Sequence, residues 1–284
     1  MTYPTDRPAT WFVTGTSRGL GLALVRHLLD RGDRVAATTR SADRLLAALG
    51  GAATPALLPL EVDLTDEAAV RGAVDEATAR FGGIDVVVNN AGYGYLGAVE
   101  DTSASDVRRM LDVQVGGTWN VLRAVLPGMR AAGSGHVITV SSILGLLAFP
   151  GWGLYCAAKF AVEGLTESLA GEVAEHGIRV TIVEPGYFDT NFLREGSLEV
   201  TGAAGDAYPA VRSMIEAHRA MPGTQPGDPA RAAAALVTIA ARGAGPLRQQ
   251  LGSDSSGMAA DRATALAAEV AAGRELALTT DKRA

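Results

Sequence analysis

Tyr155 and Lys159 are four residues apart, a spacing that places a phenol and an ammonium on one face of a helix. A free phenol has a pKa of about 10, too high for ready proton exchange at neutral pH. A nearby ammonium lowers that pKa because it favours the phenolate. Ser142 follows the apolar run His136 to Val140, and its hydroxyl is placed to hold a carbonyl oxygen against the phenol. Apart from Lys159 and Lys282, every basic residue of the chain is an arginine. The set predicts proton transfer at a carbonyl or alcohol oxygen, although a chance Tyr and Lys on an amphipathic helix would show the same spacing.

A glycine-rich segment, Thr14 to Gly21, follows the apolar run Trp11 to Val13 and opens the amphipathic stretch Leu20 to Asp30. Glycines at such a place permit a tight turn and let backbone N–H groups approach a pyrophosphate at a helix N-terminus. The spacing is G-x3-G-x-G rather than the commoner G-x-G-x-x-G, and a purely structural turn would also use glycine. Its position after the first strand of an alternating pattern favours nucleotide binding.

Two arginines bear on which nucleotide is bound. The second apolar run, Arg34 to Thr38, continues to Arg40 without the acidic residue that would accept a hydrogen bond from a ribose 2′-hydroxyl. Arg18 and Arg40 together are suited to a 2′-phosphate, because guanidinium groups bind phosphate well. The alternative is that both are solvated surface arginines in an Arg-rich chain. We expect NADP(H) in preference to NAD(H).

Short apolar runs alternate with amphipathic stretches along most of the chain. The runs predict strands that are covered on both faces, at Trp11 to Val13, Arg34 to Thr38, Leu57 to Val62, Ile84 to Val88, His136 to Val140 and Ile178 to Val183. Helical patterns lie between them, at Leu20 to Asp30, Ala42 to Leu49, Glu67 to Phe81, Ala104 to Met129 and Leu154 to Glu175. The alternation predicts an α/β fold with right-handed crossovers. We expect a single doubly wound domain over residues 1–284, with a parallel sheet of about seven strands and helices on both faces.

The alternation of strands and helices stops in residues 186–227, which contain no clear strand and one helical pattern, Ala207 to Arg219. An insertion of this kind beside a sheet is commonly a substrate lid, and we expect one here. A helix should resume at Asp228, with Asp228 as N-cap and Pro229 as first residue. Leu247 to Leu251 could add a last strand, and Met258 to Leu276 reads as an Ala-rich helix with charges on one side.

Composition excludes several classes of protein. The net charge of −6 provides no basic field for a nucleic acid. The single cysteine, Cys156, excludes a disulfide framework, and the four scattered histidines form no ligand-spaced pair. We find no signal-peptide pattern and no apolar run of the roughly 20 residues that a membrane span needs. We expect a soluble, cytoplasmic protein without a nucleic-acid or membrane partner and without a metal site.

The sequence resembles the short-chain dehydrogenase/reductase family, in its compact single-domain branch. The resemblance runs from about Trp11 to Asn191 and is looser beyond. It rests on motifs that stand in the family's order and at its separations: Thr14 to Gly21, Asp63-Leu64, Asn89-Asn90-Ala91-Gly92, Ser142, Tyr155 with Lys159, and Pro185-Gly186 followed by Thr190. The tail, Leu251 to Asp254 and the helix after it, is loosely similar to members that act on steroids, retinoids and other lipophilic alcohols or ketones.

The resemblance implies a Rossmann domain and a role for each matched residue. Tyr155 would be the general acid/base, Ser142 the anchor of the carbonyl, and Lys159 a ligand of the ribose that also tunes Tyr155. Asp63 would bond the adenine amino group, with Leu64 behind it. The implied cofactor residues are Gly15, Thr16, Ser17, Arg18, Gly19, Leu20, Gly21, Arg40, Asp63, Leu64, Asn89, Ala91, Gly92, Tyr155, Lys159, Pro185, Gly186, Phe188 and Thr190.

The sequence departs from the family at Gln114. The family has an Asn there, in a pattern like Asp-Val-Asn-x-x-Gly, and that Asn is thought to hold a water that relays protons to the Lys. Gln carries the same amide on a longer arm, so the relay is either rebuilt, with Gln114 among the catalytic residues, or replaced by contact with the substrate. Asn120 cannot stand in for it, because six residues turn it about 240° around a helix.

The expected substrate wall is apolar or aromatic and suits a lipophilic or aromatic ketone. It comprises Tyr93, Leu144, Phe149, Trp152, Tyr187 and Phe192, with Leu96 and Met221 as further candidates; many of these would serve equally as ordinary core or dimer contacts. Arg194 and Arg212 keep a substrate with a carboxylate or phosphate group as an alternative. His218 is expected at the surface of the lid rather than in catalysis.

The leading hypothesis is an NADPH-dependent carbonyl reductase, or ketoreductase, that also works as an alcohol dehydrogenase. An isomerase, cyclase or imine-directed enzyme on the same scaffold is the alternative, and a nucleotide-sensing protein without turnover is a third, which the intact Ser142, Tyr155 and Lys159 disfavour. The resemblance also implies a homodimer or homotetramer through the Ala104–Met129 and Leu154–Glu175 helices. Substrate identity, hydride face and physiological direction cannot be inferred from the sequence.

Overall fold

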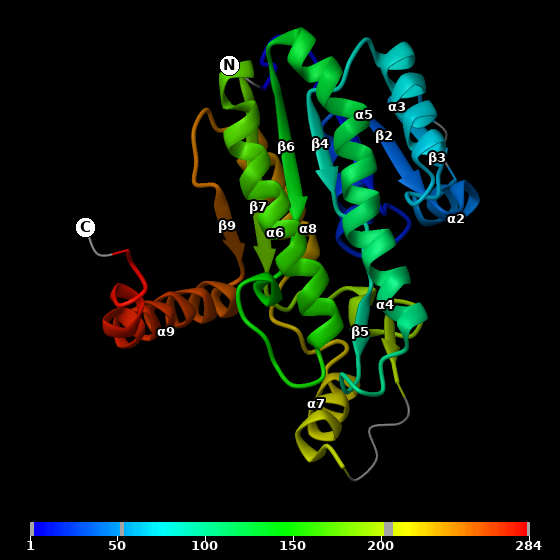
Figure 1. The fold of residues 1–284 in the computed structure, drawn as a ribbon. Coiled ribbons are helices and arrows are strands. Elements are labelled where there is room, and N and C mark those ends of the chain that lie inside the picture. Colours follow the sequence, from blue (N-terminus) through cyan, green and yellow to red (C-terminus); the bar gives the residue numbers. More distant parts are fainter. Residues whose placement is uncertain (1–2, 52–53, 202–206, 283–284) are drawn as a thin grey trace.

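Short buried segments form a parallel sheet at the centre of the molecule (Figure 1). The structure is a computed structural model that describes residues 3–51, 54–201 and 207–282. Within these ranges the sheet has seven strands, as predicted. In spatial order they are β3 (Leu57–Glu61), β2 (Arg34–Thr39), β1 (Thr10–Thr14), β4 (Val86–Asn89), β6 (Gly135–Val140), β7 (Ile178–Pro185) and β9 (Arg248–Leu251).

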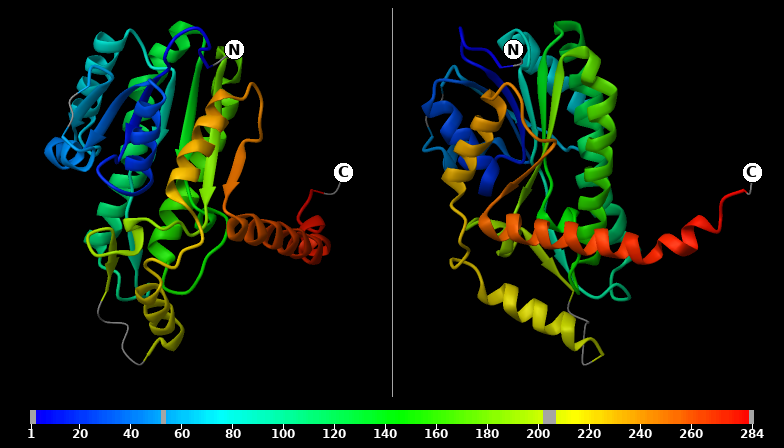
Figure 2. Two further views of the ribbon diagram at one scale, coloured as in Figure 1. Left: turned by 180° about the vertical axis from the view of Figure 1, so that it is seen from behind. Right: turned by 90° about the vertical axis from the view of Figure 1, so that its left-hand side faces the viewer.

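Helices cover both faces of the sheet, which explains why the strands are almost continuously apolar. Trp11 and Val13 point to one face and Phe12 points to the other, because successive side chains of a strand alternate. The first face, seen from behind in Figure 2, carries α1 (Gly19–Asp30), α2 (Ala42–Ala48) and α8 (Pro229–Ala241). The second carries α3 (Glu67–Phe81), α5 (Gly117–Ala132) and α6 (Gly153–Val173). The predicted doubly wound α/β fold is confirmed.

The order of the strands reverses between β1 and β4. The helix after β1 covers one face of the sheet and the helix after β4 covers the other, so the chain leaves a crevice beyond the carboxyl ends of these two strands. Thr14 ends β1 and Asn89 ends β4 at this point. The crevice is where an open α/β sheet places its ligand.

The predicted helix from Ala104 to Met129 is not continuous. It consists of α4 (Ala104–Leu111), a π-helical turn (Asp112–Gly116) and α5, which runs on to Ala132. A π-turn inserts an extra residue into the helical repeat and shifts the side chains that follow it. Gly117, at the start of α5, packs closely, since a Cβ there would lie 2.9 Å from the Cβ of Leu64. Gly116 and Gly117, two weak helix formers, mark the place, but the apolar periodicity continues through it and predicted one helix.

Two short strands, which the sequence did not predict, lie beyond the carboxyl edge of the sheet. β5 (Gly94–Leu96) pairs in parallel with β8 (Leu198–Val200), so the expectation of no strand in residues 186–227 is wrong. Segments of three residues are too short to show alternation. They lie with α7 (Pro209–Ala220) at the lower end of the view in Figure 1. Residues 202–206 of the expected lid lie outside the described residues.

The C-terminal part follows the predictions with one change. The Asp228 side chain caps α8 by accepting from the backbone of Ala230 at 2.7 Å, and Pro229 is the first residue, as expected. The last helix, α9 (Ser253–Leu278), begins before Met258 and projects from the body (Figures 1 and 2). From residue 263 onward, each of its described residues is exposed. Within the described ranges, no helix combines the length and apolar character needed to cross a membrane.

Candidate active site

A cavity of about 430 Å³ lies at the carboxyl edge of the sheet, where Gly15, Gly92, Ser142 and Gly186 follow four neighbouring strands. It brings together most of the residues that the sequence singled out. Those that line it are Gly15, Ser17, Arg18, Gly19, Leu20, Arg40, Asp63, Leu64, Ala91, Gly92, Tyr93, Ser142, Leu144, Phe149, Trp152, Tyr155, Lys159, Pro185, Gly186, Tyr187, Phe188, Thr190 and Phe192. Thr16, Gly21, Asn89 and Gln114 belong to the same region but do not line the cavity.

Tyr155 and Lys159 lie on the buried face of α6, each with 5% of its surface exposed. The Lys159 ammonium donates a hydrogen bond to the carbonyl oxygen of Val140 at 3.1 Å and lies 5.5 Å from the centre of the Tyr155 ring. The Ser142 hydroxyl accepts from the backbone of Leu144 at 3.1 Å, and Ser142 and Tyr155 line the same cavity. The helix and the end of β6 thus bring phenol, ammonium and hydroxyl together at one point.

Burial dominates the proton chemistry of this group. It raises the pKa of Tyr155 above its usual value, and the hydrogen bond from Ser142 opposes only part of that rise. It lowers the pKa of Lys159 to about 8, while the charge of Glu163 raises it. The raised pKa of Tyr155 favours the protonated phenol, in keeping with the role of general acid that the resemblance implies. A protonated phenol is the form that donates a proton.

Gln114 lies in the π-turn and is 2% exposed. Its amide nitrogen donates to the carbonyl oxygen of Tyr93 at 2.9 Å and to the sulfur of Met110. Its amide oxygen is buried without a hydrogen-bond partner among the described residues. A Cβ on Gly92 would lie 3.0 Å from that oxygen and 3.7 Å from Lys159 Nζ. The unpartnered acceptor therefore lies on the same side of Gly92 as the ammonium.

Asn120 lies away from this group. Its amide donates to the carbonyl oxygen of Leu64 at 2.9 Å.

Glycines shape the turn after β1. Gly15 has φ +71°, and a Cβ there would lie 2.7 Å from the Cα of Ala91. A Cβ on Gly21 would lie 2.3 Å from the carbonyl oxygen of Gly15, so α1 packs directly on the turn. The Thr16 hydroxyl donates to the Thr38 carbonyl oxygen at 3.1 Å. Thr16 and Gly21 thus build the turn rather than face the cavity.

Asn90, which the sequence analysis named as part of the motif Asn89-Asn90-Ala91-Gly92 but not among the cofactor residues, lines the cavity. Its amide nitrogen donates to the carbonyl oxygens of Thr14 at 2.8 Å and Gly15 at 3.1 Å, which ties β4 to the glycine turn. Asn89, the neighbour that was expected to border the cofactor, is 5% exposed, and its amide atoms have no partner among the described residues. The motif Asn89-Asn90-Ala91-Gly92 carried the signal, and Asn90 is its member at the cavity.

Arg18 and Arg40 line a small positive hollow beside the cavity, together with Arg44. Arg18 also donates to the carbonyl oxygen of Gly196. Burial lowers the pKa of Arg18, and the charges of Arg40 and Arg44 lower it further, as expected of three close cations. Ser17, Thr39 and Ser41 complete the hollow, which has no carboxylate in its lining. Arg44 was missed, although its place four residues after Arg40 is the signal that identifies it.

Asp63 and Thr190, which the resemblance implies as cofactor residues, both line the cavity. The Asp63 oxygen Oδ1 accepts from the backbone and hydroxyl of Thr65 at 2.9 and 2.8 Å, which lowers the pKa of the carboxyl and leaves Oδ2 for a ligand. Thr190 packs over the glycine turn, since a Cβ on Gly19 would lie 3.7 Å from its Cβ.

Aromatic side chains surround Tyr155 on the substrate side. Its ring lies 5.4 Å from that of Trp152 and 5.5 Å from that of Phe192, centre to centre. Leu96 and Met221 pack in the hydrophobic cluster around this wall and do not line the cavity, and neither do Arg194 and Arg212. Arg109 lines it, which the sequence did not indicate, and forms ion pairs with Asp106 and Glu199.

His218 does not lie at the surface of the lid, as expected, but is 3% exposed and lines the cavity. Its Nδ1 is 2.9 Å from the carbonyl oxygen of Met214 and its Nε2 is 3.0 Å from the Tyr187 hydroxyl. The Met214 carbonyl requires a proton on Nδ1, so Nε2 accepts from Tyr187. The helical spacing of Val211, Ile215 and His218, all buried on α7, is the signal that was overlooked.

Comparison with known proteins agrees with this geometry. The family model described as short chain dehydrogenase matches residues 9–199. "Oxidoreductase BOA17" of Botryotinia fuckeliana is 36% identical over 95% of this chain and 98% of its own length. A "3-ketodihydrosphingosine reductase" of Bacteroides thetaiotaomicron is 35% identical over 87% and 88%, respectively.

Solved structures give the same result. A short-chain dehydrogenase from Streptomyces avermitilis superposes with a TM-score of 0.89 at 34% identity, covering 98% of this chain and all of that one (100%). A short chain dehydrogenase from Burkholderia cenocepacia, in complex with NADP, has a TM-score of 0.69 at 28% identity and covers 93% and 97%. The protein is an NAD(P)-dependent oxidoreductase and belongs to the short-chain dehydrogenase/reductase family.

Proposed function

We propose that the protein is an NADPH-dependent carbonyl reductase, reversible as an alcohol dehydrogenase, for lipophilic or aromatic ketones. The observation that carries the proposal is the meeting of Ser142, buried Tyr155 and buried Lys159 in the lining of one aromatic cavity. The aromatic neighbours of Tyr155 favour an apolar substrate. The name of the Bacteroides relative, a reductase of a lipid ketone, is in keeping with this class.

The cavity fits a dinucleotide phosphate. Gly15 and Gly21 leave space for a backbone turn that a side chain would fill, at the N-terminus of α1 where phosphate binds favourably. The positive hollow of Arg18, Arg40 and Arg44 suits a 2′-phosphate rather than a free hydroxyl. NADP in the Burkholderia structure supports this choice.

The residues of the chain divide the reaction among them. When bound, the nicotinamide cofactor supplies the hydride that reduces the carbonyl carbon. Ser142 donates a hydrogen bond that orients the carbonyl oxygen, and Tyr155 transfers its phenolic proton to that oxygen. The Lys159 ammonium stabilises the phenolate that remains. The aromatic wall keeps water from the reacting carbon.

The experiment that tests the function is a panel of apolar and polar ketones with NADPH or NADH, followed by loss of reduced-cofactor absorbance. We expect substrate-dependent oxidation of NADPH with aromatic or lipophilic ketones. Product formation without net cofactor oxidation would instead favour an isomerase or cyclase, and activity restricted to imines would favour an imine reductase. Tight NADPH binding with no turnover of any ketone or imine would favour a nucleotide sensor.

Gln114 should support proton transfer without touching the substrate, because its side chain does not line the cavity and its unpartnered oxygen lies near Lys159. Gln114→Asn should leave kcat within about tenfold, a barrier change of about 1.4 kcal/mol. Gln114→Ala should cost more, since buried polar groups left unpaired cost about 1–3 kcal/mol. Kinetics of both variants on two unrelated ketones measure this. A change in substrate preference with Gln114→Asn, or an Ala variant as fast as the parent on both ketones, contradicts the relay.

We also propose a homodimer or homotetramer through α5 and α6. Trp119 on α5 is 52% exposed and Phe160 on α6 is 46% exposed, an unusual exposure for large aromatic side chains. Light scattering should give a multiple of the chain mass, and Trp119→Glu with Phe160→Glu should reduce it. A parent protein that is monomeric at micromolar concentration contradicts the proposal.

A further inference from the structure

Two buried carboxyl groups lie behind Lys159. Glu163 on α6 is 4% exposed and Glu184 on β7 is 0% exposed. The two groups are within hydrogen-bond reach of each other. Arg248 Nε donates to Oε2 of Glu163 at 3.1 Å, and the side-chain amide of Gln250 donates to Oε2 of Glu184. The pair and its two donors therefore join α6, β7 and β9.

The two remaining oxygens define what the pair lacks. Oε1 of Glu163 and Oε1 of Glu184 are both buried and accept no hydrogen bond from the described residues, although Arg248 Nε lies 3.5 Å from Oε1 of Glu184. Buried polar atoms are normally hydrogen-bonded, and two adjacent buried carboxylates repel each other. A single proton between the two oxygens would satisfy both atoms and remove the repulsion.

The surroundings place that proton on Glu184. Arg248 Nε lies 3.1 Å from the Glu163 carboxylate but 3.5 Å from Oε1 of Glu184. Burial raises the pKa of both carboxyls, and for Glu163 the neighbouring Ser141 hydroxyl and Arg248 oppose the rise. Burial and the charge of Glu163 raise the pKa of Glu184 to about 7. Ser141 and Arg248 therefore favour the ionised form on Glu163 and the proton of the pair on Glu184.

The ionised carboxylate faces the catalytic lysine. Lys159 and Glu163 are four residues apart on the buried side of α6, so they lie on one face of the helix. The charge of Glu163 raises the pKa of Lys159, against the burial that lowers it. The Glu163 side chain also packs against the segment after β6, because a Cβ on Gly145 would lie 2.5 Å from Oγ of Ser141 and 2.9 Å from Cγ of Glu163. Glu163 is thus held against the segment that carries Ser142.

The other charged side chains near the pair have partners of their own. Glu167, one turn further along α6, is exposed and accepts from Arg248 at 2.8 Å. Asp254 at the start of α9 accepts from the backbone of Tyr187 at 2.8 Å. On the other side of Lys159 are the neutral Tyr155 and the amide of Gln114. Glu163 is the negative charge at the buried end of this group.

We propose that Glu163 is a positioning residue for Lys159: Glu184 keeps its proton and donates a hydrogen bond to Glu163, whose carboxylate stays ionised and holds the Lys159 ammonium charged inside the protein. The sequence pattern Tyr155, Lys159, Glu163 repeats every four residues, so one helix face carries the acid, the cation and the counter-charge. The inference rests on the proposed function only for the role of Lys159 in turnover.

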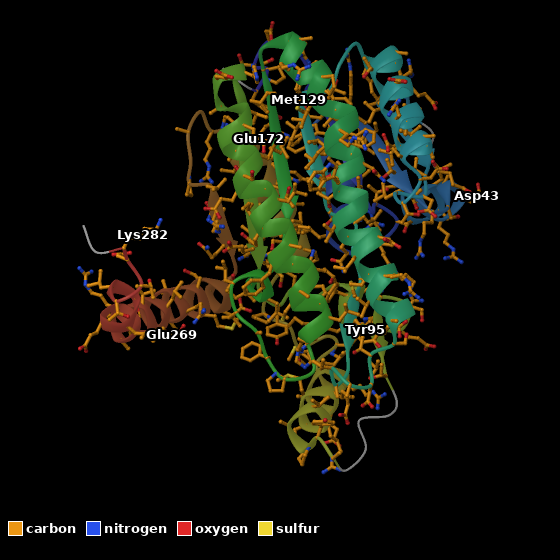
Figure 3. All side chains as sticks on the ribbon, viewed as in Figure 1. Asp43, Tyr95, Met129, Glu172, Glu269 and Lys282 are labelled. Carbon is orange, nitrogen blue, oxygen red and sulfur yellow. The ribbon has the colours of Figure 1, made fainter. Side chains whose placement is uncertain are left out.

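The two-lysine composition gives a direct test. Protein labelled with ¹³C-lysine shows two Nζ-linked signals, from buried Lys159 and from Lys282, which lies beyond α9, away from the sheet (Figure 3). We expect Glu163→Gln to lower the pKa of Lys159 by about one unit, the lower end of the effect of a close opposite charge. Glu184→Gln, which retains a donor in place of the proton, should leave it within a few tenths of a unit. Lys282 should titrate identically in every variant.

Glu167→Gln is the matched control, because it removes a carboxylate from the same helix and the same arginine but from the exposed side. It should not move the Lys159 titration. A Lys159 pKa that is unchanged in Glu163→Gln overturns the proposal, and so does a shift in Glu184→Gln as large as that in Glu163→Gln. The titration needs no substrate, so its failure is distinct from failure of the proposed function. Where the ketone assay works, the alkaline limb of kcat in Glu163→Gln should move to lower pH by the same amount.

A second measurement covers the case in which Glu163→Gln does not fold. The infrared carbonyl band of a buried protonated carboxyl should be present in the unmodified protein at neutral pH and absent in Glu184→Gln. Its absence from the unmodified protein, or its persistence in Glu184→Gln, overturns the assignment of the proton.

Discussion

Tyr155→Phe should abolish ketone reduction while NADPH still binds. The substitution removes one hydroxyl and keeps the ring that packs between Trp152 and Phe192. The missing group is the phenolic hydroxyl, the proton donor of the proposed reaction, which shares the cavity with Ser142. A positioned general acid is worth about 10²–10⁴ in rate, so kcat should fall by at least about 100-fold. Steady-state kinetics give the loss, and calorimetric titration with NADPH should show a Kd within about threefold of the parent, under about 1 kcal/mol.

Tyr93→Phe is the matched control, since Tyr93 lines the same cavity and its buried hydroxyl also lacks a partner among the described residues. It should retain most of the activity. Substantial ketone reduction by Tyr155→Phe would mean that another group supplies the proton. Loss of NADPH binding in the same variant would mean that the phenol serves the cofactor rather than the carbonyl.

Lys159→Arg should be nearly as damaging as Tyr155→Phe. The ammonium fits a fully enclosed place against the Val140 carbonyl. A guanidinium is larger, planar and permanently charged, so it cannot reproduce a compact cation directed at both the ribose and the phenol. The comparison separates the charge of Lys159 from its shape, because the charge is conserved.

The fold was predictable where the signal is local. Strands that are buried on both faces read as short apolar runs, and the alternation with helices fixed the sheet and its crossovers. The catalytic group was also local: Tyr155 and Lys159 share one helix turn, and Ser142 follows a strand at the same edge of the sheet. Loop residues at the carboxyl ends of parallel strands must meet, so their order along the chain was enough to bring them together.

What could not be predicted depends on contacts between distant segments. The pairing of Glu163 with Glu184 joins a helix to a strand, and Arg248 joins it from a third element. No residue spacing in the sequence predicts such a pair. The π-turn around Gln114 was missed because the apolar periodicity runs through it, although Gly116 and Gly117 stand at its end. His218 was misplaced because a polar residue in a lid is exposed by default, whereas here its ring packs against Trp152.

The cofactor preference should depend on the positive hollow. We expect the unmodified protein to bind NADPH at least tenfold more tightly than NADH, about 1.4 kcal/mol, because Arg18, Arg40 and Arg44 surround a site without an acid. Arg40→Asp should change the affinity for NADPH and the affinity for NADH in opposite directions. It removes a cation from the 2′-phosphate and introduces a carboxylate that repels the phosphate but accepts a hydrogen bond from a ribose 2′-hydroxyl. The preference should therefore be flattened or reversed.

Titration of both cofactors into parent and variant measures the change, with Arg274→Asp as the control, since it makes the same charge change on the exposed part of α9. That control should leave both affinities unchanged, which separates a local contact from the effect of net charge. Raising the salt concentration should weaken NADPH binding by the parent more than by Arg40→Asp, because ions screen exposed charges. Equal affinity of the unmodified protein for NADPH and NADH would show that these arginines are solvated surface groups, and the hollow would then have no part in choosing the nucleotide.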